Sequence, residues 1–141
     1  MARVNKHLLL IGFGCTGKTS LGRSAFQGEN VIDSDDKILK WIETTQQEKF
    51  DHIYQIYIRK GREEAIRLIQ QAEQALITKW AGETSRKLIS LGPGFPFREG
   101  WSRLRARSHV ILFRRSPQGI YESFKERRKA IFTRVPRSEE P

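Results

Sequence analysis

A glycine-rich segment at residues 12–19 carries the residue types that bind phosphate groups. It reads Gly-Phe-Gly-Cys-Thr-Gly-Lys-Thr and directly follows the apolar run 8–11. A strand that enters a helix through such a turn points backbone N–H groups and the positive end of the helix dipole at one spot, which suits a polyanion. Lys18 can reach the β- and γ-phosphates of a nucleoside triphosphate, and the Thr19 hydroxyl can complete the shell of a Mg²⁺ ion. The residues expected to surround ATP are Gly12, Gly14, Cys15, Thr16, Gly17, Lys18, Thr19 and Ser20.

The glycines of this segment admit a second interpretation. They also satisfy the dinucleotide-binding pattern Gly-x-Gly-x-x-Gly, and Asp33 lies at a suitable distance downstream to bind a ribose hydroxyl. Lys18 and Thr19 favour the triphosphate, because a dinucleotide fold needs no cation and metal-binding hydroxyl directly after its third glycine. A chance match to the motif is the third alternative.

Carboxylates follow the next apolar run, Val31-Ile32, as part of the sequence Asp-Ser-Asp-Asp at 33–36. Phosphoryl transfer to an alcohol needs a carboxylate that orients the attacking hydroxyl and accepts its proton, and we assign this catalytic role to Asp35. Asp33 lies nearer the strand end and is expected to support the metal opposite Thr19. The alternative is that both carboxylates only cap a helix.

Apolar runs alternate with helical periodicity along the chain. Strands are expected at residues 7–11, 31–32, 87–91 and 110–113, and helices at 18–26, from 33–36 past Ile42, and at 53–58, 64–80, 101–106 and 117–132. This order is typical of an α/β fold with a mostly parallel sheet flanked by helices, in which ligands bind at the carboxyl ends of the strands. The loops at 12–18, 33–36 and 92–94 should therefore open on one rim.

Four segments together resemble the shikimate kinase family. They are the loop Gly12–Thr19, the sequence Ile-Asp-Ser-Asp at 32–35, the helix that follows Gly61, and the turn Gly92-Pro93-Gly94. The resemblance runs from residue 7 to about 132 and implies a P-loop NTPase fold, a three-layer sandwich like that of the nucleoside monophosphate kinases. It also implies transfer of a phosphoryl group from ATP, with Mg²⁺, to a hydroxyl of shikimate in aromatic amino acid biosynthesis.

The resemblance implies further site residues. Arg67, followed three positions on by Gln70, takes the place of the substrate-binding arginine if one extra residue is allowed after Gly61. Gly92, Pro93 and Gly94 take the place of the family's substrate-binding glycine turn. Arg134 corresponds, by rough position, to the arginine of the mobile lid that completes the catalytic site.

The chain departs from the family at several of these positions. Pro93 removes one backbone donor from the glycine turn and fixes its φ angle. Gln70 replaces the glutamate that would hold the arginine, and Ser123 stands where an adenine-stacking arginine is expected. The family also continues into a fifth strand and a last helix. We therefore expect a kinase-like domain at residues 1–132 without these elements, and a disordered or truncated lid segment at 133–141.

The charge of the chain indicates anionic partners. Its 141 residues include 26 Lys and Arg against 16 Asp and Glu, a net charge of +10. A small acidic substrate, such as shikimate or a similar hydroxy acid, and nucleic acid both fit this charge, but no RNA-binding or helix-turn-helix signature is present. No apolar run approaches the roughly 18 residues of a membrane span. No signal peptide precedes the first strand, so a cytoplasmic location is expected.

Two alternatives to shikimate phosphorylation remain open. One is a kinase for another small hydroxy acid, because Pro93 and Gln70 alter the acceptor pocket. The other is a nucleotide-binding protein without transfer chemistry, which binds RNA through the basic stretch at 117–132. The single cysteine, Cys15, excludes a disulfide within the chain, and the three histidines lack the spacing of metal ligands. The sequence does not determine the oligomeric state.

Overall fold

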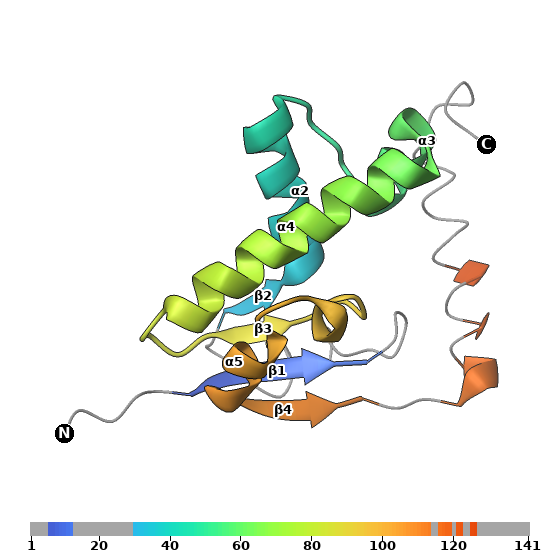
Figure 1. The fold of residues 1–141 in the computed structure, drawn as a ribbon. Helices are drawn as coiled ribbons and strands as arrows, with labels where there is room; N and C mark the ends of the chain where they lie inside the picture. The colour runs from blue at the N-terminus through green and yellow to red at the C-terminus, as the bar shows by residue number, and fades with distance from the viewer. Residues whose placement is uncertain (1–5, 13–29, 114–115, 120, 123–124, 127–141) are drawn as a thin grey trace.

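The computed structural model describes residues 6–12, 30–113, 116–119, 121–122 and 125–126 (Figure 1). Four strands form one sheet: β1 (His7–Ile11), β2 (Val31–Asp33), β3 (Leu88–Ser90) and β4 (Ser108–Leu112). The helices are α2 (Ser34–Gln46), α3 (Ile53–Lys60), α4 (Arg62–Gly82) and α5 (Trp101–Ala106), with a 3-10 turn η1 (Phe95–Phe97).

All three strand pairings are parallel, and the strand order is β2-β3-β1-β4. The expected α/β fold with a parallel sheet flanked by helices is thus confirmed. The expected strand at 110–113 begins two residues earlier, at Ser108, because the whole of β4 pairs with β1 from His7 onward. The expected helix at 18–26 lies outside the described residues, as does much of the one at 117–132.

The core lies between the sheet and the described helices. Leu9 and Ile89 point from the sheet into a cluster that includes Ile42 of α2, Leu68 of α4 and Leu104 of α5, all of them buried. Figure 1 shows α4 running across the sheet, with α2 and α5 beside it. The opposite face carries a second buried cluster of leucines, Leu8, Leu10 and Leu88.

Helix α4 is long because its apolar residues recur at helical spacing over 21 residues. Near its C-terminal end, Trp80 packs against Phe95 of η1, with ring centroids 5.9 Å apart. This contact holds the segment after β3 against the helix. None of the described helices has both the length and the hydrophobicity needed to cross a membrane.

His7 joins the start of β1 to the end of α4. The backbone N–H of Lys87 donates to His7 Nδ1 at 3.0 Å, so Nδ1 is the accepting nitrogen. Nε2 therefore carries the proton and donates it to the carbonyl of Trp80 at 2.9 Å. This fully buried histidine therefore links the strand to the helix from inside the fold.

Candidate active site

Three strands end at one level of the sheet. The register pairs Asp33 of β2 with Ser90 of β3, and Ser90 with Leu10 of β1. Because these strands are parallel neighbours, the chain leaves each of them at the same edge. The residues two positions beyond this row are Asp35, Gly92 and Gly12. The three loops expected to share a rim therefore start from it together.

The first turn of α2 is built by its own side chains. Asp33 is the N-cap, and its Oδ1 accepts a hydrogen bond from the backbone N–H of Asp35 at 2.9 Å. Ser34 is buried, and its Oγ accepts from the backbone N–H of Gly92 at 2.9 Å. The bond from Asp35 to Asp33 confirms that Asp33 caps the helix, which does not exclude a further role. The bond from Gly92 to Ser34 ties α2 to the turn after β3.

Asp35 faces the turn that begins at Gly92. An ideal Cβ on Gly92 would stand 3.7 Å from Oδ1 of Asp35 and 3.7 Å from Oγ of Ser34. The Asp35 side chain is half-buried. Two of the predicted site residues, far apart in sequence, therefore lie close together at this rim.

A buried carboxylate that sequence reasoning missed lies under the same turn. Glu73 of α4 has a side chain only 7% exposed, and it approaches Gly94 so closely that a Cβ there would stand 2.9 Å from Oε1. Arg98 pairs with it, with Nε 3.3 Å from the same Oε1 and 3.3 Å from the carbonyl oxygen of Gly94. The turn thus carries an ion pair between a buried carboxylate and a partly exposed guanidinium beside the predicted acceptor site.

Burial raises the pKa of Glu73 to about 6. The Arg98 guanidinium opposes this rise in pKa, and the Asp35 carboxylate adds to it. The influence of Asp35 on Glu73 indicates that the two carboxylates share one electrostatic environment at the rim. A group with a displaced pKa in such a place is a candidate for function.

The sequence held a signal for Glu73. The apolar stripe of α4 passes through Ile69, Leu76 and Trp80, and Glu73 stands at the spacing where another apolar residue belongs. A carboxylate on the buried face of a helix is rarely left without a partner.

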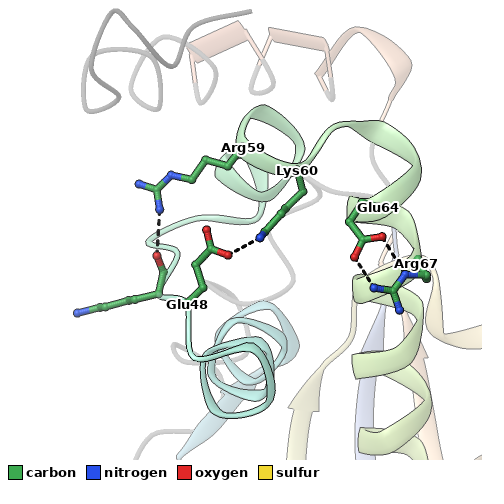
Figure 2. Close-up of polar contacts among 6 residues, drawn as sticks. Glu48, Arg59, Lys60, Glu64 and Arg67 are labelled. Atoms are coloured by element: carbon green, nitrogen blue, oxygen red, sulfur yellow. Dashed lines mark hydrogen bonds and ion pairs between the residues drawn. The ribbon is translucent and has the colours of Figure 1, made fainter.

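The structure places Arg67 away from the charged residues at the rim, which are Asp35, Glu73 and Arg98. Its guanidinium pairs with both carboxylate oxygens of Glu64, one of them 2.9 Å from Nε, and both side chains are about half exposed (Figure 2). At about 100° per residue, Arg67 lies about 120° around α4 from Glu73. The ionic partner that Gln70 cannot provide to Arg67 is thus supplied by Glu64, which lies about one turn before Arg67, whereas Gln70 lies about one turn after it.

Neighbouring contacts in Figure 2 hold α3 to the chain that follows α2. Lys60 forms an ion pair with Glu48 at 2.5 Å, and Arg59 Nη1 donates to the carbonyl of Lys49 at 3.2 Å. The Arg59 guanidinium also lies over the ring of Phe50, 5.3 Å from its centroid. These basic residues of α3 serve packing and pairing.

The other predicted site residues lie outside the described part of the chain. They are Gly14, Cys15, Thr16, Gly17, Lys18, Thr19, Ser20 and Arg134. Gly12 is described and directly follows the last residue of β1. In the described ranges, no group of three or more His, Cys, Asp or Glu side chains is arranged to hold a metal ion.

Solved structures to which this chain is similar include two shikimate kinases. The enzyme from Acinetobacter baumannii, solved in complex with shikimate, superposes with a TM-score of 0.64 and 18% identity over 95% of this chain and 70% of its own. The enzyme from Aquifex aeolicus gives a TM-score of 0.47 and 21% identity over 96% of this chain and 88% of its own. No protein-family model and no curated protein sequence matches the chain. The fold is therefore shikimate kinase-like, and the similarity rests on structure.

Proposed function

We propose that the protein is an ATP-dependent small-molecule kinase that phosphorylates a hydroxyl group of shikimate or of a similar hydroxy acid. One observation carries this proposal: Asp35 lies against Gly92 at the edge of the sheet where the phosphate-binding sequence begins at Gly12. A carboxylate at that place can orient an alcohol toward a phosphate held by the neighbouring loop.

The roles of the residues follow from their chemistry. Asp35 would accept a hydrogen bond from the acceptor hydroxyl and then its proton. Lys18 would neutralise charge on the transferred phosphoryl group, and Arg134 would add a second cation from the lid.

A magnesium ion fits the proposed donor set. Asp33 and Thr19 offer hard oxygen ligands, and Mg²⁺ commonly takes only one or two protein ligands, with phosphates and waters completing its shell. The ion, when bound, would neutralise part of the negative charge on the phosphate oxygens.

The acceptor class is suggested by the Acinetobacter enzyme, which binds shikimate on the same fold. The turn of this protein differs from three consecutive glycines by Pro93, and its Gly92 N–H is committed to Ser34. Fewer backbone donors are left for a substrate, so side chains must supply more of its recognition. The acceptor can therefore be a hydroxy acid related to shikimate, and the assay includes such acids together with shikimate.

Coupled ADP release from the full chain tests the proposal. ATP and Mg²⁺ are supplied with a panel of hydroxy acids, shikimate included, and the phosphorylated product is identified by mass spectrometry. Lys18→Met is the control, and we expect it to abolish turnover without changing the circular dichroism spectrum. ATP binding without ADP release for any acceptor would favour the nucleotide-binding alternative. Turnover that survives Lys18→Met would remove the loop from its assigned role.

A further inference from the structure

Within the described part of the chain, Arg98 is held at the rim through one of its three guanidinium nitrogens. Its Nε contacts both the carbonyl oxygen of Gly94 and Oε1 of Glu73, each at 3.3 Å. Among the residues that the structure describes, Nη1 and Nη2 form no hydrogen bond or ion pair. The side chain is 21% exposed, so these two nitrogens are not sealed within the core.

Two terminal guanidinium nitrogens form a planar fork that matches the two oxygens of a carboxylate. Glu73 and Gly94 already restrict the Arg98 side chain, so a ligand that binds the fork loses less conformational entropy in ordering it. Arg67 differs in this respect, because Glu64 occupies both Nε and a terminal nitrogen of its guanidinium.

The position of this fork agrees with a substrate site. Arg98 donates to the carbonyl oxygen of Gly94, two residues along the turn from Gly92, and Gly92 is the residue that lies beside Asp35. Asp35 also acts electrostatically on Glu73, the partner of Arg98. A cation and a carboxylate therefore flank one short turn at the carboxyl edge of the sheet. Such a pair is suited to a molecule with an acid group on one side and a hydroxyl on the other.

We infer that Arg98 binds the carboxylate of the acceptor while Asp35 binds its hydroxyl, and that Glu73 is a positioning residue for Arg98. The inference rests on the proposed function and names the residue that selects acids over neutral alcohols. It assigns this selection to the segment after β3, whereas the sequence resemblance points to Arg67 of α4.

Calorimetric titration of the full chain with shikimate and with its methyl ester tests the inference. Arg98→Ala is compared with Arg103→Ala, which removes the same charge from an exposed position nearby. We expect Arg98→Ala to weaken shikimate binding about 10- to 100-fold, as for the loss of a charged hydrogen bond, and to leave ester and ATP binding unchanged. Arg103→Ala should leave all three unchanged, and Arg98→Lys should recover only part of the loss.

The positioning role of Glu73 is tested by kinetics. Glu73→Gln should raise KM for the acid with little change in kcat, and this effect should vanish in an Arg98→Ala background. An effect of Glu73→Gln that persists without Arg98 would show that Glu73 acts on stability alone.

Three outcomes would overturn the role of Arg98. They are equal affinity of the natural chain for shikimate and its ester, an unchanged affinity in Arg98→Ala, and a loss in Arg98→Ala that the ester shares. Failure of the proposed kinase activity would appear separately, as absence of Lys18-dependent ADP release, because the titration needs no turnover.

Discussion

The carboxylate of Glu73 occupies the space that a side chain on residue 94 would need. An ideal Cβ at Gly94 would stand 2.9 Å from Oε1, closer than real Cβ atoms come to a neighbouring atom, and 3.0 Å from Cδ. Helix α4 can thus pack this closely against the turn after β3 because residue 94 has no side chain.

Gly94→Ala should therefore push Glu73 aside and destabilise the fold by about 1–3 kcal/mol, the usual cost of overpacking. The measurement is the free energy of unfolding in urea. Gly82→Ala is the matched control, because its Cβ meets nothing within 4 Å and the change should be neutral or stabilising by about 0.5–1 kcal/mol. Equal stability of the two variants would mean that Glu73 moves away at no cost.

Ser34→Ala should loosen the link between α2 and the turn. The Gly92 N–H would lose its acceptor, which costs about 1–2 kcal/mol for a poorly hydrated donor. Urea denaturation measures this loss, and hydrogen exchange at the Gly92 amide should accelerate in parallel. Ser102→Ala, at an exposed position of α5, serves as the control. If exchange at Gly92 stayed unchanged, the Ser34 bond would not be what protects the turn.

The pKa of Glu73 gives the protein a pH-dependent stability. Burial raises this pKa from 4.5 to about 6, against the effect of Arg98 of the turn and with that of Asp35 of α2. The folded state thus holds the proton more tightly than the unfolded state. The resulting stabilisation is complete below pH 4.5 and is lost as the pH rises through about 6.

Glu73→Gln removes this titration. Relative to the variant, the natural chain should lose on the order of 1 kcal/mol of unfolding free energy between pH 4.5 and about 6.5. Urea unfolding at four pH values across this window measures the difference. Glu99→Gln removes an exposed carboxylate nearby and controls for net charge. A difference between natural chain and Glu73→Gln that does not vary with pH would contradict the assignment.

Asp35→Asn should reduce kcat for ADP release by about 10²- to 10⁴-fold, because the amide cannot accept the hydroxyl proton. Its effect on nucleotide affinity should be small. Asp36→Asn, the exposed neighbour in the same helical turn, removes an equal charge and should leave kcat near that of the natural chain. Similar losses in both variants would point to the general field of the helix terminus instead of a specific role for Asp35.

The sequence predicted the frame of the site well. Strand ends and loops follow from apolar runs bounded by glycine and aspartate, and a parallel sheet then predicts that Asp35 and Gly92 lie at the same edge. The order β2-β3-β1 is what makes the prediction work, since it places the two loops on adjacent strands.

The partners of the charged side chains were harder to predict. Arg67 has polar residues within one helical turn on both sides, Glu64 before it and Gln70 after it. Spacing alone does not tell whether Arg67 binds one of these side chains or a substrate. The Glu73–Arg98 pair joins residues 25 positions apart through a turn whose path depends on the packing of Phe95 against Trp80. Such a contact depends on tertiary packing and has no local sequence signal.

The strand order also bears on how the protein is made. Leu8 pairs with Leu88 on one side and His109 on the other, so β1 has no strand beside it until the second half of the chain has been synthesised. Until then its leucine-rich segment emerges from the ribosome with both edges open. Parallel pairing of β1 therefore has to wait for segments far along the chain, as in other folds whose sheets are built from non-local contacts.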